Sequence, residues 1–279
     1  MLRFSENMFV NVSKFLKPKD IIVCIDVCKK FKTSFTNPLI WNNICNQMDA
    51  LISIKDKHLE GIELYRHLML VKDINALNNK FKWNKRIDEV LNTSMIYHGH
   101  NNLGEIPKEL THLNKLKLLE LVGNKITTIP THISKLVNLE MLFLGIGMIN
   151  LIPNEMCQLT KLRKLTLFNN RITEFPSDIS KLVNLETLNL LDNQISEIPK
   201  TIKYLTNLEE LNLYANRITE IPIEFCQLIK LQQVELSWNL IKEIPKEVIY
   251  LTNLRKLNIH TNKIKAIPDE LKHMTCIKI

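Results

Sequence analysis

Apolar residues recur at a fixed interval of 23 residues along the last two thirds of the chain. One such unit reads LETLNLLDNQISEIP from Leu185 to Pro199, and the next unit begins at Leu208. Leu188 and Leu190 alternate with their neighbours as they would in a short strand with one buried face. A unit of this length cannot bury its apolar face alone. The period therefore predicts a solenoid in which each unit packs against the next.

Proline and asparagine keep the same interval. Eight of the ten prolines lie 23 residues apart, from Pro107 to Pro268, each directly after Ile or Phe. Asparagine follows the predicted strand at positions 101, 124, 170, 193, 216, 239 and 262. Its amide can hydrogen-bond backbone groups of adjacent units, and proline suits an extended segment outside the sheet because it lacks an N–H. Gly147 replaces this asparagine in the third unit, so we expect one rung of the ladder to be missing there.

These units resemble the leucine-rich repeat, whose pattern is L-x-x-L-x-L-x-x-N-x-L. Eight of them cover residues 93–279. The first is atypical, because Thr93 and His98 stand where leucines belong. The resemblance implies an α/β solenoid, a horseshoe whose parallel strands form a concave sheet.

Residues 1–46 lack this period and predict a small all-helical domain. Apolar residues at positions 8, 9, 12, 15 and 16 have helical spacing. Asp20 precedes the apolar run from Ile21 to Val27 as a helix N-cap would. The segment contains Val27-Cys28-Lys29 and ends on Leu39-Ile40-Trp41.

These features resemble an F-box, whose members begin with Leu-Pro-x-Glu, contain Val-Cys-Lys-x-Trp and close on Leu-Trp. Phe4-Ser5 replaces the opening Leu-Pro, and Phe31 replaces the first Trp. A helical cap for the solenoid is therefore the alternative interpretation. The resemblance implies that a Skp-type adaptor binds Glu6, Phe9, Leu16, Ile21, Val27, Leu39 and Trp41.

Residues 47–92 connect the two parts. Apolar residues from Leu59 to Leu77 lie among charges, and only Gly61 interrupts them. This pattern predicts two or three helices and a stiff connection, not a flexible linker.

Side chains between the strand leucines are expected on the concave face, where a solenoid holds its partners. Exposed aromatic residues are common anchors of protein interfaces. One or two of them folding back on the scaffold is the alternative. The predicted target-binding residues are Phe143, Phe168, Leu191, Tyr214 and Trp238.

Composition adds mainly exclusions. The formal net charge of +8 is spread along the chain and not gathered in one block, which argues against nucleic acid as a partner. We see no signal-peptide pattern and no apolar stretch long enough to span a bilayer, so we expect an intracellular, cytoplasmic protein (in the host cytoplasm if it is viral). The six cysteines contain no C-x-x-C pair, which is consistent with a reducing compartment.

The sequence predicts no chemistry of its own. There is no glycine-rich phosphate loop, and His98 and His100 have no cysteine or carboxylate cluster to complete a metal site. We therefore expect a protein that is not an enzyme, with no cofactor and no metal. The combined resemblance implies the substrate-recognition subunit of a cullin-type (SCF) ubiquitin ligase. A leucine-rich-repeat scaffold for signalling proteins such as GTPases or phosphatases is the alternative.

Overall fold

The computed structural model describes residues 61–278, in two compact units that divide between Ile87 and Asp88. The F-box-like segment, with its seven predicted adaptor-binding residues, lies outside the described residues, as do residues 47–60 of the predicted connector. Two α-helices occupy the rest of that connector, α4 (Gly61–Lys80) and α5 (Ile87–Leu91).

Helix α4 buries one face and ends in a compact aromatic turn. Ile74 and Leu77 are fully buried. After the helix, Lys82 adopts a left-handed conformation (φ 54°), and the Trp83 N–H donates to the Asn78 carbonyl (2.8 Å). The Trp83 ring stacks on Phe81, with 4.8 Å between ring centroids.

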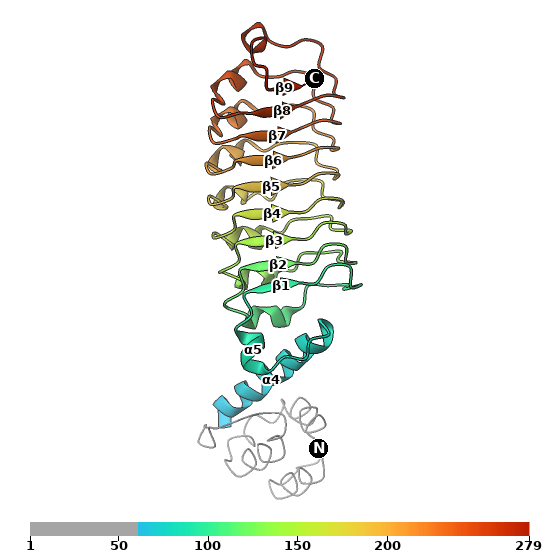
Figure 1. Cartoon of the computed structure of the whole chain (residues 1–279), viewed down its shortest axis with the longest axis vertical. Coiled ribbons are helices and arrows are strands. Elements are labelled where there is room, and N and C mark those ends of the chain that lie inside the picture. The colour runs from blue at the N-terminus through green and yellow to red at the C-terminus, as the bar shows by residue number, and fades with distance from the viewer. Residues whose placement is uncertain (1–60, 279) are drawn as a thin grey trace, which may run out of the picture. The chain divides into compact units, whose positions relative to one another are not determined.

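The second unit is built on a nine-stranded parallel sheet whose strands follow one another in chain order (Figure 1). The strands are β1 (Met95–Tyr97), β2 (Leu118–Glu120), β3 (Met141–Phe143), β4 (Lys164–Thr166), β5 (Thr187–Asn189), β6 (Glu210–Asn212), β7 (Gln233–Glu235), β8 (Lys256–Asn258) and β9 (Ile277–Lys278). From β1 to β8, residues 23 apart are register partners, as Leu188 and Leu211 are. We call each 23-residue turn a coil.

The last coil breaks the period. Leu257 pairs with Ile277, which is 20 residues further on, so this coil is three residues shorter than the others. The ninth strand therefore lies where the 23-residue period alone would not place it.

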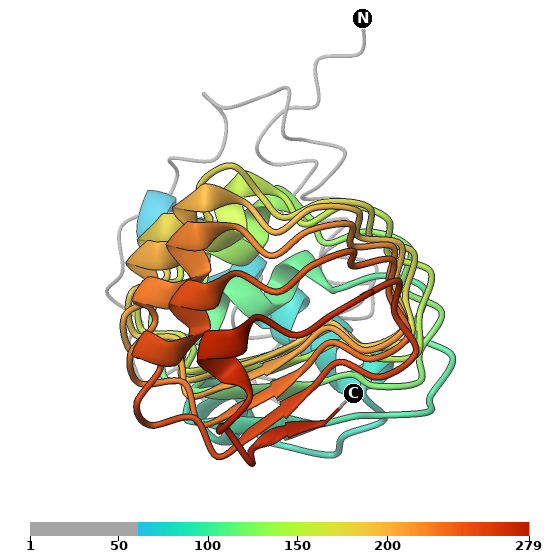
Figure 2. The ribbon, with the colours of Figure 1, turned by 90° about the horizontal axis from the view of Figure 1, so that it is seen from above.

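Between consecutive strands, each coil forms a short 3₁₀ helix on the side away from the sheet (Figure 2). These are η2 (Lys108–His112), η3 (Thr131–Lys135), η4 (Asn154–Gln158), η5 (Ile179–Lys181), η6 (Lys200–Tyr204), η7 (Ile223–Gln227), η8 (Lys246–Tyr250) and η9 (Asp269–Leu271). The α/β description needs correction here, because no coil contains an α-helix between its proline and its next strand. A segment of three to five residues is long enough for one 3₁₀ turn but too short to form a stable α-helix.

Proline sets the start of these turns. Pro199 precedes η6 in an extended conformation (φ −71°, ψ 146°), and a proline directly precedes each of the other 3₁₀ helices except η5, which begins after Asp178. The extended conformation is one that proline favours, and its missing N–H leaves no donor unpaired. The predicted role of the proline column is confirmed.

The core runs through the middle of every coil. The repeated apolar positions of the fifth unit are all buried: Leu185, Leu188, Leu190, Ile195, Ile198, Ile202 and Leu205. Thr93 and His98, which replace leucines in the first unit, are buried as well.

The asparagine ladder forms as predicted. Asn193 Nδ2 donates to the carbonyls of Leu167 and Leu190 (both 3.0 Å), and its Oδ1 accepts from the Ile172 N–H (3.0 Å). Two of these three bonds reach the preceding coil. At Gly147 the rung is missing, and no described residue accepts from the Ile126 N–H, the group to which an asparagine there would bond.

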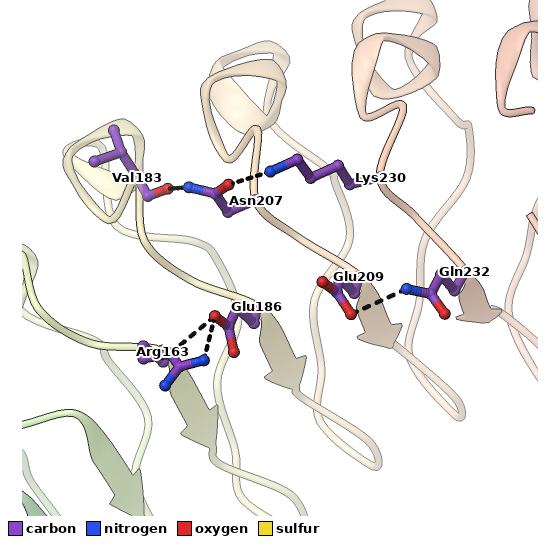
Figure 3. Close-up of polar contacts among 7 residues, drawn as sticks. All are labelled: Arg163, Val183, Glu186, Asn207, Glu209, Lys230 and Gln232. Atoms are coloured by element: carbon purple, nitrogen blue, oxygen red, sulfur yellow. Dashed lines mark hydrogen bonds and ion pairs between the residues drawn. The ribbon is translucent and has the colours of Figure 1, made fainter. Parts of the chain in front are cut away.

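A second polar ladder, not foreseen in the sequence, runs along the flank between the 3₁₀ helices and the strands (Figure 3). Asn207 Nδ2 donates to the Val183 carbonyl (2.8 Å), and Lys230 Nζ donates to Asn207 Oδ1 (2.7 Å). Arg163 pairs with Glu186 one coil further on (2.7 Å). Exposed pairs of this kind add little stability individually, but each of them joins neighbouring coils.

Candidate protein-binding surface

The exposed face of the sheet carries three columns of side chains, which we call the strand face. In each of β1–β8 the first and third residues flank a buried middle residue, as Thr187 and Asn189 flank Leu188. The third column lies two residues beyond each strand. It contains Val122, Phe168, Leu191, Tyr214, Ser237 and His260, with Gly99 and Gly145.

The predicted target-binding residues do not form one row. Phe143 lies in the second column, and Phe168, Leu191 and Tyr214 follow one another in the third. All four are partly exposed. Trp238 lies outside the columns, in the turn after β7, where it adopts a left-handed conformation (φ 57°) and is 55% exposed. The third-column residue of its coil is Ser237, which is fully buried.

Phe168 is partly folded back on the scaffold. A Cβ added to Gly145 would lie 2.3 Å from Cε1 of the Phe168 ring. The ring therefore rests against the backbone of the preceding coil, in space that only glycine leaves open. This contact with Gly145 orients the ring and explains its partial burial.

Met95 and Tyr97 of β1 are large exposed apolar residues that the sequence prediction did not include. They are 50% and 66% exposed, and Tyr97 Oη donates to Met95 Sδ (3.7 Å). The available signal was their register with Phe143, since Tyr97 occupies the second column two coils earlier.

A polar groove of about 180 Å³ crosses the strand face from β5 to β8. The sequence prediction missed it, because it sought large apolar side chains. Besides the middle residues of β5–β7, it is lined by Thr187, Asn189, Glu210, Asn212, Gln233, Glu235 and Lys256. The first two columns of the strand face are thus polar from β5 to β8. Its large apolar side chains between β3 and β6 are Met141 and Phe143 on β3 and Phe168, Leu191 and Tyr214 in the third column.

Backbone hydrogen bonds fix the orientation of two amides in this groove. Asn189 Oδ1 accepts from the Leu191 N–H (3.1 Å), and Asn212 Oδ1 accepts from the Tyr214 N–H (3.0 Å). Each oxygen binds its own chain two residues on, as in an Asx turn. The Nδ2 donors have no bond to any described residue, so they are available to a ligand.

Glu235 is held ionised by its neighbours. Its carboxylate accepts from Ser237 Oγ and from Asn258 Nδ2 (2.8 Å), and Lys256 Nζ lies 3.6 Å away. Burial opposes the ionised form, but these hydrogen bonds and the lysine outweigh it and lower the pKa of Glu235 below its ordinary value. Glu235 and Lys256 therefore neutralise each other within the groove.

The described residues contain two buried thiols that are not activated, and they contain no metal cluster. Burial raises the pKa of the Cys157 and Cys226 thiols to about 12, so both stay protonated near neutral pH, where a thiol is a poor nucleophile. Among residues 61–278 no three His, Cys, Asp or Glu side chains are grouped closely enough to hold a metal ion. None of the described helices is both long and apolar enough to cross a membrane.

Family models support the repeat assignment. A model of leucine-rich repeats in two copies matches residues 160–204, and a leucine-rich-repeat model matches residues 183–241. The second unit is a leucine-rich-repeat solenoid. Both models match within these leucine-rich repeats, and no F-box domain was found. A search of curated proteins found no significant match.

Solved structures with the same fold come from bacteria and plants. A leucine-rich-repeat protein of Leptospira interrogans is 37% identical (TM-score 0.56), and the match covers 60% of this chain and 48% of that one. The ectodomain of the Arabidopsis thaliana receptor kinase GASSHO1/SCHENGEN3 is 32% identical (TM-score 0.59), covering 62% of this chain and 22% of that one. An internalin C2 of Listeria monocytogenes is 22% identical (TM-score 0.62), covering 74% and 89%, which shows the fold alone. The chain thus spans less than half of the first two.

Proposed function

We propose that this protein is the substrate-recognition subunit of a cullin-type ubiquitin ligase. In this proposal residues 1–46 bind a Skp-type adaptor, and the strand face of the leucine-rich repeats holds a target protein. The strand face supports the proposed target binding, because it exposes ordered polar and apolar groups across several strands. The F-box resemblance of residues 1–46 supports the proposed binding of the adaptor of a ubiquitin ligase.

The comparisons support partner binding by such repeats. The Arabidopsis receptor ectodomain is in complex with CASPARIAN STRIP INTEGRITY FACTOR 2, and a plant peptide hormone receptor, 32% identical, is in complex with RGF2. Repeat solenoids commonly bind partners over extended surfaces of this kind.

The proposed mechanism requires no reaction on this chain. A target held on the strand face stays close to a ubiquitin-charged enzyme bound through the adaptor. Tethering raises the effective concentration of target lysines at that enzyme, typically into the millimolar range for short connections. In this proposal the protein acts in the cytoplasm, without a cofactor, by holding the target close to the enzyme.

A pull-down of the full chain with a purified Skp-type adaptor tests the proposed adaptor binding. We expect binding that Trp41→Ala abolishes, because the resemblance places Trp41 in the adaptor interface. Trp238→Ala, an exposed tryptophan of the repeats, is the matched control and should bind as the unmodified chain does. Binding that survives Trp41→Ala, or no binding at micromolar concentration, would remove the F-box assignment.

A repeat scaffold for signalling proteins such as GTPases or phosphatases is the second candidate. One observation favours it: the family models match only the leucine-rich repeats. In that case the strand face would still bind a partner, and the adaptor would not bind.

A further inference from the structure

Glu210 is the unpaired charge of the polar groove. It is exposed at the start of β6, and no described residue offers its carboxylate a hydrogen bond or ion pair. Its register partners, Thr187 and Gln233, are neutral. Lys164 and Lys256 lie two strands away on either side, and Lys256 pairs with Glu235. At roughly 10 Å such charges are largely screened by physiological salt.

The groups beside Glu210 suit an extended peptide. The free Nδ2 donors of Asn189 and Asn212 flank it on β5 and β6, and their pinned oxygens prevent the amides from turning over. Preset donors of this kind can bind the carbonyl oxygens of a peptide backbone at little cost in side-chain entropy. A carboxylate next to them selects a cationic side chain, and the arginine fork matches a carboxylate best.

The separation of Glu210 from the apolar side chain of Phe143 sets the spacing of the groups that a partner would present to them. Phe143 lies on β3, three strands from Glu210 on β6. Neighbouring strands are about 4.8 Å apart, which gives about 14 Å across three strands, and the offset of one column raises the separation of the two side chains to about 16 Å. An extended chain advances about 3.4 Å per residue, so four to five residues cover roughly that distance.

We propose that the strand face binds an extended segment of the partner protein that carries an arginine or lysine at Glu210 and an apolar residue about four to five positions away at Phe143. This inference rests on the proposed partner-binding role of the strand face and names the chemistry of the partner. Net charge supports this occupant, since the groove has two carboxylates and one lysine and gains neutrality from one cation.

Synthetic peptides test the spacing directly. Each carries one arginine in a Gly-Ser background, with a leucine placed one to seven positions before or after it, and binding to the full chain is measured by fluorescence anisotropy. The tightest binding is expected at a spacing of about four to five, on one side of the arginine. Equal binding at all spacings, or no binding at millimolar peptide, would overturn the proposal.

Two neighbouring glutamates provide a matched pair of variants. Glu210→Gln should reduce the preference for arginine over glutamine in the peptide by about tenfold, the usual effect of losing one charged hydrogen bond. Glu209→Gln is the control, because Glu209 lies on the flank, where it accepts from Gln232 Nε2 (3.0 Å; Figure 3). Equal effects of the two substitutions would show nonspecific charge attraction and contradict the proposal.

The outcome is separable from that of the ligase proposal. If the adaptor binds in a Trp41-dependent manner but no peptide does, the partner is a folded surface and this inference alone fails. If the peptides bind with the expected spacing and the adaptor does not, the ligase proposal alone fails.

Discussion

At the residue scale, the asparagine ladder concentrates stability in a few side chains. Asn193 is buried and bonds four backbone groups of two coils. Asn193→Ala removes the acceptor of the Ile172 N–H and one hydrogen bond from each of three carbonyls, so we expect unfolding to require about 3 kcal/mol less, measured by urea denaturation.

Asn184 is the matched control for this substitution. It is exposed and donates one hydrogen bond, to the Thr160 carbonyl (2.8 Å). Asn184→Ala should cost less than about 1 kcal/mol, since water can replace that bond. Similar losses for the two variants would show that the buried ladder is not what joins the coils.

Residue spacing predicted the columns of the repeat but not the direction of every side chain. Trp238 lies 24 residues after Tyr214, one position past the column, and the sequence prediction included it because it follows Ser237 directly. The backbone turns to a left-handed conformation at this position in every coil from the first to the eighth. Gly123, Asn169 and Asp192 at the equivalent position were the available signal, because these residue types tolerate that conformation.

At the scale of elements, the close approach of Phe168 to Gly145 can be tested by a double-mutant cycle. Gly145 has no positive φ, so Ala there costs only the clash with the ring. We expect Gly145→Ala to lower the free energy of unfolding by about 1–3 kcal/mol, and by less than about 0.5 kcal/mol when Phe168→Ala is already present.

Gly104→Ala controls for the loss of glycine itself. A Cβ at Gly104 meets no atom within 4 Å, so this substitution should be neutral or slightly stabilising. Additive effects of Gly145→Ala and Phe168→Ala would show that the ring does not rest on that glycine.

Elements were predictable where one local rule decides them. Proline directly precedes all of the described 3₁₀ helices except η5, and the apolar alternation marks the strands up to β8; both signals are visible in the sequence. The type of helix was not, because whether a short turn closes as 3₁₀ or α depends on how it packs against its neighbours. The polar groove also escaped prediction, since it arises from side chains of four different coils.

At the scale of the whole molecule, stability and binding both arise from neighbouring coils. A solenoid is stabilised mainly by nearest-neighbour interfaces, and the hydrogen bonds of Asn193 and Asn207 are contacts of that kind. The strand face is likewise a property of several coils, with an apolar part around Phe143 and a polar groove from β5 to β8. A partner that covers both parts must extend across the coils.

Two glutamines on opposite sides of one coil test directly whether the strand face binds a partner protein. Gln233 is exposed on the strand face, and Gln227 is exposed in η7 on the other side. A photo-crosslinking residue is placed at either position in the full chain, and the products formed in cells are identified by mass spectrometry. We expect a discrete partner to be crosslinked from position 233 and not from position 227. Equal crosslinking from both positions, or crosslinking from position 227 alone, would contradict this expectation.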